Sequence, residues 1–143
     1  MRQLQISISN LKQSGDLCFT LCPRNAGHDN RAYRITLDIN GSEITLKEEV
    51  WSGSGTTCNT VGSVAISPAL GSWFNLRIEY EDTDSGAQTR VYINGSKVYT
   101  TNKVYSKQLN LDNNNIALMV VFMKGLVTTV KFDDTQLITV DKF

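Results

Sequence analysis

Apolar and polar residues alternate with a period of two through most of this chain, and an Asn-Gly pair interrupts the alternation at two places. The stretch RVYINGSKVY, residues 90–99, shows both features, with Asn94-Gly95 at its centre. A period of two places successive side chains on opposite faces of an extended strand. Asn and Gly tolerate the positive φ angles that a type I′ hairpin turn requires. The pattern therefore predicts an antiparallel hairpin.

The same alternation predicts strands elsewhere, and residues 33–50 form a second predicted hairpin with a type I′ turn at Asn40-Gly41. The apolar run IALMVVFM, residues 116–123, predicts a strand buried on both faces, whereas residues 51–63 are rich in Gly, Ser and Thr and predict a loop. No segment has the period of an amphipathic helix. We expect an all-β chain, a single antiparallel β-sandwich of jelly-roll type over residues 1–143.

Composition excludes several classes of protein. The chain has 143 residues, 14 basic and 14 acidic, so it lacks the excess of positive charge typical of nucleic-acid binders. The sequence contains no run of 18 apolar residues, which is about the length that a membrane-spanning helix needs. The start MRQLQISISN lacks the apolar block of a signal peptide. Either the protein is not exported by that route, or the chain is a domain of a longer one.

The cysteines leave two alternatives open. Cys18 and Cys22 are four residues apart in a predicted strand, about 13 Å, which is too far for a disulfide. Cys58 could pair with either of them, or all three thiols are reduced. Zinc is disfavoured because His28 is the only histidine and no second close Cys pair exists.

Four segments together resemble the concanavalin A-like lectin/glucanase family, which includes laminin-G-like modules. The first is residues 71–102, which begin with GSWFNLRIEY, and the second is residues 127–140, with the sequence VTTVKFDDTQLITV. The other two are the earlier predicted strand segments at 11–21 and 31–50. The resemblance implies that Trp73 opens a strand and packs in the core. Such domains commonly begin with a strand beside the last one, and this chain starts close to the second. We therefore expect a sheet edge that is open, or filled by a preceding domain or another chain.

The family includes both enzymes and binding proteins, so the fold alone does not fix an activity. Glucanases of this fold carry three acids on one strand. Glu79 and Glu81 share a predicted strand face, but no third acid has the family spacing, and Glu43, Glu48 and Glu49 do not match it. No nucleophile elbow accompanies the lone His28. We expect no enzymatic activity and no catalytic residues.

Related sandwiches often bind calcium through loop oxygens. The candidate ligands here are Asp29, Asp82, Asp84, Asp112, Asp133 and Asp134. None of them belongs to a recognisable calcium-loop signature, so we expect no cofactor, keep calcium as the alternative and assign no metal ligand.

The predicted ligand-binding residues are Trp51, Arg34, Asp38, Arg90 and Tyr92. Arg34 and Asp38 alternate with core-facing residues of one predicted strand, and Arg90 and Tyr92 do the same in another. If both strands lie in one sheet, they offer rings, guanidinium groups and a carboxylate to a saccharide. An ordinary solvated sheet face is the alternative. Trp51 begins the predicted loop, where it either forms a binding platform or covers the core.

These features favour a non-catalytic carbohydrate-binding or adhesion module on an extracellular or virion surface, with a glycan as partner and other protein chains as possible neighbours. A structural protein–protein interaction domain of a phage capsid, fibre or tail is the alternative. A glycoside hydrolase is the least favoured, because the acids are missing.

Overall fold

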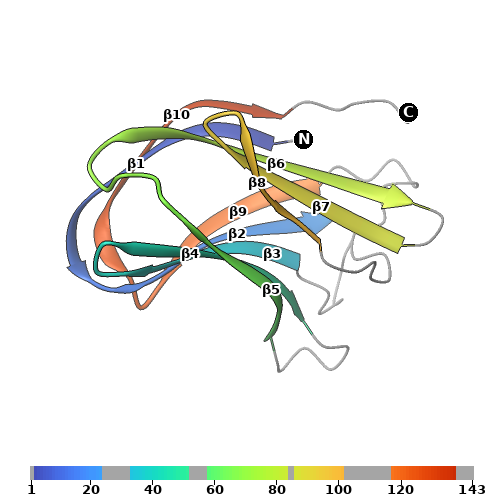
Figure 1. Ribbon diagram of the computed structural model, residues 1–143, viewed down its shortest axis with the longest axis horizontal. Coiled ribbons are helices and arrows are strands. Elements are labelled where there is room, and N and C mark those ends of the chain that lie inside the picture. Colours follow the sequence, from blue (N-terminus) through green and yellow to red (C-terminus); the bar gives the residue numbers. More distant parts are fainter. Residues whose placement is uncertain (1, 24–32, 52–57, 84–85, 102–116, 138–143) are drawn as a thin grey trace.

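The computed structural model describes residues 2–23, 33–51, 58–83, 86–101 and 117–137 of the chain (Figure 1). These residues form ten strands and no helix, so the all-β prediction is confirmed for this part of the chain. The strands are β1 (Arg2–Gln13), β2 (Gly15–Pro23), β3 (Tyr33–Asn40), β4 (Glu43–Trp51), β5 (Cys58–Ile66), β6 (Trp73–Thr83), β7 (Gly86–Ile93), β8 (Ser96–Thr100), β9 (Ala117–Lys124) and β10 (Val127–Leu137). The described residues contain no helix that is long and apolar enough to cross a membrane.

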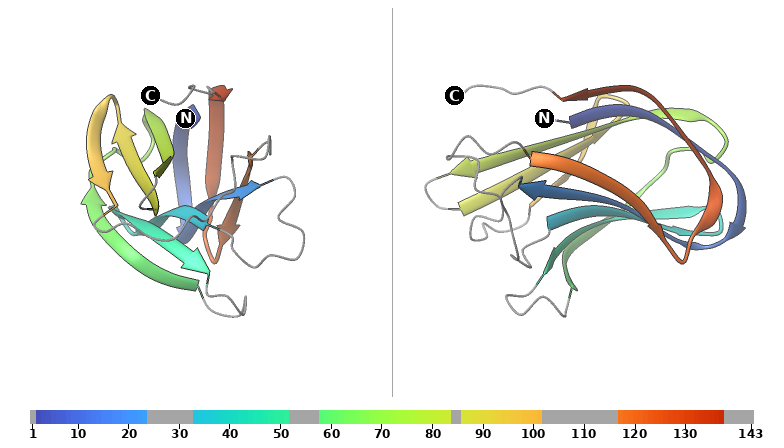
Figure 2. Two further views of the ribbon diagram at one scale, coloured as in Figure 1. Left: turned by 90° about the vertical axis from the view of Figure 1, so that its right-hand side faces the viewer. Right: turned by 180° about the vertical axis from the view of Figure 1, so that it is seen from behind.

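The strands form two five-stranded sheets that lie one over the other, which confirms the predicted β-sandwich (Figure 2). Sheet A has the order β10-β1-β6-β7-β8, and sheet B has the order β5-β4-β3-β2-β9. All pairs are antiparallel. The chain passes from sheet A to sheet B after β1, returns after β5, crosses again after β8 and returns after β9. Each sheet therefore has one face on the core and one outer face.

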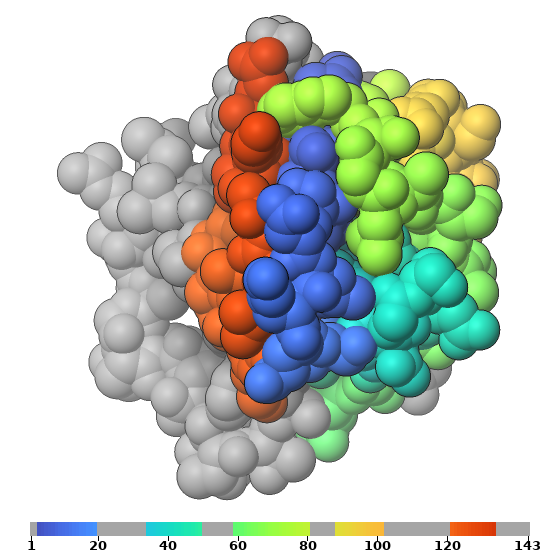
Figure 3. Space-filling view, turned by 90° about the vertical axis from the view of Figure 1, so that its left-hand side faces the viewer, coloured from blue at the N-terminus to red at the C-terminus, as the bar shows by residue number. Residues whose placement is uncertain are grey.

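The first strand lies inside sheet A, between the last strand and β6 (Figure 3). Ile6 of β1 is paired with Phe132 of β10 on one side and with Phe74 of β6 on the other. The expectation that the chain lacks the strand beside its last one is therefore wrong. Residues 2–13 themselves supply that strand, and the alternating Leu4, Ile6 and Ile8 on its inner face belong to the core.

Both predicted hairpins are present, but their turns differ. In the β7–β8 hairpin Ile93 pairs with Ser96, and Asn94 and Gly95 between them both have positive φ, as a type I′ turn requires. In the β3–β4 hairpin Asn40 pairs with Glu43, so the central residues are Gly41 and Ser42. Only Gly41 has positive φ there, which is the signature of a type II′ turn. The prediction of type I′ at Asn40-Gly41 is thus wrong, because the register places Asn40 in the strand.

Apolar side chains from the inner faces of both sheets form one core. Its fully buried members come from β1, β2, β3, β4, β6 and β7, and the largest are Leu4, Ile6, Ile8, Leu17, Phe19, Ile35, Leu37, Ile39, Ile44, Leu46 and Leu76. Burial of this apolar surface is the main source of stability in such a sandwich. Because the inner residues alternate with outer ones along each strand, the core also determines which side chains reach the outer faces.

Two local predictions are wrong. The run at 116–123 was expected to be buried on both faces, but β9 is an edge strand of sheet B, where Phe122 and Met123 are exposed. An edge strand has a sheet neighbour on one side only, so its apolar side chains lose part of their cover. The segment 51–63 was expected to be a loop, but β5 begins at Cys58 and pairs with β4, with a bulge opposite Glu48 and Glu49.

A buried carboxylate connects the two sheets. Glu48 of β4 lies on the inner face of sheet B and accepts hydrogen bonds from the Tyr99 hydroxyl at 2.7 Å and the Thr101 hydroxyl at 2.9 Å. The Thr101 hydroxyl also accepts a hydrogen bond from the Thr89 amide of β7 at 2.8 Å. These bonds hold β4 of sheet B against the β7–β8 edge of sheet A. They therefore limit the movement of β7 and β8, whose other side forms the outer face of sheet A.

Candidate functional site

The predicted ligand-binding residues do not share one face. Arg34 and Asp38 belong to β3 in sheet B, whereas Arg90 and Tyr92 belong to β7 in sheet A. All four lie on outer faces, so the two pairs are on opposite sides of the sandwich. The prediction of a single Arg, Tyr and Asp surface is wrong, because alternation gives the face of a residue but not the sheet that its strand joins. Trp51 ends β4, and its side chain lies outside the described residues.

Two ion pairs lie on the outer face of sheet B. Arg34 is buried and directs its guanidinium at Glu49, with Nε 3.2 Å from Oε1, and it lies 5.8 Å from the ring centre of Phe122. Lys47 Nζ is 2.7 Å from Asp38 Oδ2. Both predicted binding residues on this face are therefore engaged in ion pairs within the protein.

The carboxylates of this face have perturbed acidities. Burial and the negative charge of Asp38 raise the pKa of Asp16 above its usual range. Burial also tends to raise the pKa of Glu49. The hydrogen bonds and positive charge of the Arg34 guanidinium oppose this, and the pKa of Glu49 lies below its usual range. Glu49 is therefore a stable anion that holds Arg34 in place.

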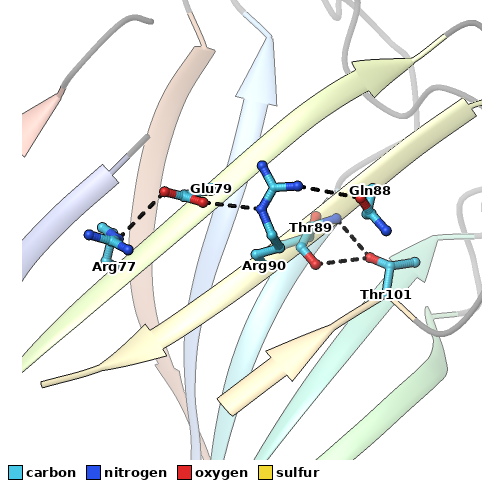
Figure 4. Close-up of polar contacts among 6 residues, drawn as sticks. All are labelled: Arg77, Glu79, Gln88, Thr89, Arg90 and Thr101. Carbon is cyan, nitrogen blue, oxygen red and sulfur yellow. Dashed lines mark hydrogen bonds and ion pairs between the residues drawn. The ribbon is translucent and has the colours of Figure 1, made fainter. Parts of the chain in front are cut away.

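The outer face of sheet A carries a more open arrangement. The guanidinium carbon of Arg77 in β6 lies 3.8 Å from the ring centre of Tyr92 in β7, which is a close cation–π stack. Glu79 lies between two arginines, with Oε2 3.5 Å from Arg77 Nε and Oε1 3.1 Å from Arg90 Nε (Figure 4). Arg90 Nη1 also donates to Gln88 Oε1 at 3.4 Å. The row thus holds one aromatic ring, two guanidinium groups and polar oxygens in a fixed order.

Strand register explains why these side chains meet. Arg77 is directly opposite Tyr92, and Glu79 is directly opposite Arg90, so each pair shares the outer face as cross-strand neighbours. Arg77 was not among the predicted site residues. The sequence does indicate that Arg77 points outward, because it alternates with the core residues Leu76 and Ile78. The pairing of β6 with β7 was the missing information.

Trp73 also lies on this outer face, and its predicted place in the core is wrong. Its side chain is 51% exposed, whereas its neighbour Phe74 is 3% exposed and packs in the core. Residues of β6 alternate, so Trp73 shares the face of Arg77, and Phe74 shares the face of Leu76. An exposed indole at the start of the strand offers a flat apolar surface to a ligand.

Amide side chains complete the face. Gln3 of β1 is opposite Arg77, and Gln5 is opposite Asn75, so these groups lie next to the stack on the same side of sheet A. We call this surface the Arg77–Tyr92 face. It consists of Gln3, Gln5, Trp73, Asn75, Arg77, Glu79, Gln88, Arg90 and Tyr92.

The described residues give no support to acid–base catalysis on this face. The Glu79 carboxylate is engaged by two guanidinium groups, and the Glu81 side chain lies outside the described residues. Within the described part of the chain no group of three His, Cys, Asp or Glu side chains is arranged to hold a metal ion. Of the six aspartates considered for calcium, only Asp133 has a described side chain. Asp82 and Asp134 are described in backbone alone, and the other three lie outside the described residues.

Comparisons with known proteins bear on the fold. No protein-family model matches the sequence, and no curated protein matches it. Among solved structures, the chain is similar to the carbohydrate-binding module CBM66 from Bacillus subtilis, with a TM-score of 0.61 and 11% sequence identity. The match covers 94% of this chain and 71% of that one. At this identity the similarity shows a shared β-sandwich fold.

Proposed function

We propose that this chain is a non-catalytic carbohydrate-binding module and that the Arg77–Tyr92 face is its binding surface. The observation that carries the proposal is the stack of Arg77 on Tyr92 at 3.8 Å on an outer sheet face that also carries an exposed tryptophan. Structural similarity to a carbohydrate-binding module supports the same function.

The chemistry of the face suits a saccharide. The apolar face of a sugar ring packs on an aromatic side chain, and its hydroxyl groups exchange hydrogen bonds with planar polar groups. Trp73 offers the exposed ring, while Asn75, Gln5 and Arg77 offer amide and guanidinium donors beside it. Trp73 and Arg77 are four residues apart on β6, about 13 Å along the strand, so the face suits several linked sugars better than one.

The wider setting is also a proposal. A weak single site gains effective affinity when several copies are displayed together, so we infer that the domain acts as part of a larger extracellular or virion-surface protein or assembly. The finer family assignment, a concanavalin A-like sandwich, is supported by the position of β1 beside the last strand. The proposed contacts use side chains alone, so binding should be unchanged by a calcium chelator.

A second candidate function rests on a different observation. Phe122 and Met123 of β9, together with Val127 and Phe132 of β10, are exposed apolar residues on the edge strands that end the two sheets on one side. Edge strands of this kind are ready to pair with or pack on another chain. This observation supports a structural protein–protein interaction domain, such as that of a phage capsid, fibre or tail.

The two candidates are separated by binding to a panel of soluble polysaccharides in affinity electrophoresis. Trp73→Ala and Tyr92→Ala should each weaken binding to the retained polysaccharide, while Phe122→Ala removes an exposed aromatic from the opposite sheet and serves as the control. If a polysaccharide binds and both variants bind it as well as the parent protein, the Arg77–Tyr92 face is not the binding surface. If no polysaccharide binds, the structural function takes first place.

A further inference from the structure

Arg77 holds donors that the protein itself does not use. A guanidinium has five N–H donors in a planar fork. The Nε of Arg77 is buried and lacks a hydrogen-bond partner, and its contact with Glu79 at 3.5 Å is an ion pair rather than a hydrogen bond. Its other contact in the described structure is the ring of Tyr92. With a side chain 29% exposed, Arg77 can still meet a ligand.

The orientation of this guanidinium is fixed before any ligand arrives. The guanidinium carbon lies over the ring of Tyr92 at 3.8 Å from its centre, and the carboxylate of Glu79 lies 3.5 Å from Nε. Stacking of this kind holds the plane while leaving the in-plane N–H groups of the outer edge accessible. Less conformational entropy is then lost when an acceptor binds, which favours recognition by a planar, two-point acceptor.

The charge balance of the surrounding strands is positive. Among the described outward side chains of β6, β7 and β8, the cations are Arg77, Arg90 and Lys97, and the anion is Glu79. The outer face of sheet B differs, because Arg34 is paired with Glu49 and Lys47 with Asp38. A negatively charged ligand is therefore attracted to the outer face of sheet A and gains little from that of sheet B.

We infer that the Arg77–Tyr92 face binds an acidic saccharide, with the carboxylate of a uronic acid received by Arg77. The inference rests on the proposed function and specifies its ligand class. A carboxylate matches the guanidinium fork with two parallel hydrogen bonds, and charge-assisted bonds are roughly twice as strong as neutral ones. A sugar hydroxyl offers only one such point. Trp73, at the start of β6, packs on a neighbouring sugar of the same polysaccharide.

The test compares polysaccharides that differ only in charge. Polygalacturonate, alginate and hyaluronate are titrated by isothermal calorimetry against the full chain, each beside its carboxyl-reduced neutral form, with dextran sulfate as a second anion. At least one uronate should bind, and its reduced form should bind about tenfold or more weakly, as expected for the loss of a charge-assisted pair. Arg77→Gln should remove that preference, and Arg77→Lys should restore it only in part. Lys124→Gln, an exposed charge change on sheet B, should leave it intact.

The outcomes distinguish the two proposals. Equal binding of a uronate and its reduced form, or an unchanged preference in Arg77→Gln, overturns the acidic ligand but leaves carbohydrate binding in place. Binding of dextran sulfate as tight as that of every uronate also overturns it, because charge alone would then explain the affinity. If neutral and acidic polysaccharides all fail to bind, the proposed function fails as well.

Discussion

Tyr99 donates its hydroxyl hydrogen to Oε1 of Glu48 across 2.7 Å, and the two residues come from opposite sheets of the sandwich. Both are buried. Tyr99→Phe removes the donor and keeps the ring, so the buried carboxylate loses one of its partners. We predict that the free energy of unfolding falls by about 1.5 to 3 kcal/mol. Urea denaturation measures this, with Tyr92→Phe on the outer face of sheet A as the matched control. Equal stability of the two variants would contradict a stabilising hydrogen bond between Tyr99 and Glu48.

Trp73 and Phe74 are consecutive aromatic residues with opposite environments, one exposed on the outer face and one in the core. Phe74→Ala should reduce the free energy of unfolding by about 3 to 5 kcal/mol, because it leaves a cavity in the core. Trp73→Ala should cost clearly less, since its indole is about half exposed. Thermal or urea melts of the two variants measure the difference. The reverse order would mean that the register of β6 is off by one residue.

Asp16 and Glu49 should give opposite pH dependences of stability. The pKa of Asp16 is raised, chiefly by burial, so the folded protein holds this proton more tightly than the unfolded chain does. Its contribution to stability is therefore lost as the pH rises above 3.8, the unfolded value. The pKa of Glu49 is lowered, so its contribution is present above 4.5 and is lost as the pH falls through its folded pKa.

The corresponding variants test these signs. Asp16→Asn should be more stable than the parent protein at pH 7, and this gain should shrink as the pH is lowered toward about 4. Glu49→Gln should be less stable at pH 7, and its deficit should shrink in acid. Urea melts across this pH range provide the measurement, and Glu43→Gln is the control for loss of an exposed carboxylate. A destabilised Asp16→Asn at neutral pH would show that its carboxylate is a favourable partner on this face.

The strands and hairpins could be predicted from the sequence because their signals are local. Alternation at 4–8, 17–21 and 74–80 coincides with β1, β2 and β6, and each Asn-Gly pair marks a hairpin that is present in the structure. Turn type was less accessible, since Asn40 is the last residue of β3 rather than part of the turn. A shift of one residue in register changes which residues need positive φ.

The candidate site could be predicted only in part, because it depends on pairing between strands. Arg90 and Tyr92 were identified as outward residues of β7, and the structure places them there. Their partners Arg77 and Trp73 come from β6, and alternation alone does not say which strand lies beside which. Arg34 was assigned to the same surface because its strand shows the same alternation, yet that strand belongs to the other sheet. Assignment of strands to sheets requires long-range contacts that a period of two does not encode.

The location of the binding surface is tested most directly by nuclear magnetic resonance. A ¹⁵N-labelled chain is titrated with an oligosaccharide from the tightest-binding polysaccharide of the panel, and backbone amide shifts are mapped onto the structure. We expect the largest changes in residues 73–79 of β6 and 90–92 of β7, with little change in residues 34–38 of β3. Changes concentrated on β2, β3 and β4 of sheet B, with β6 and β7 unaffected, would contradict it.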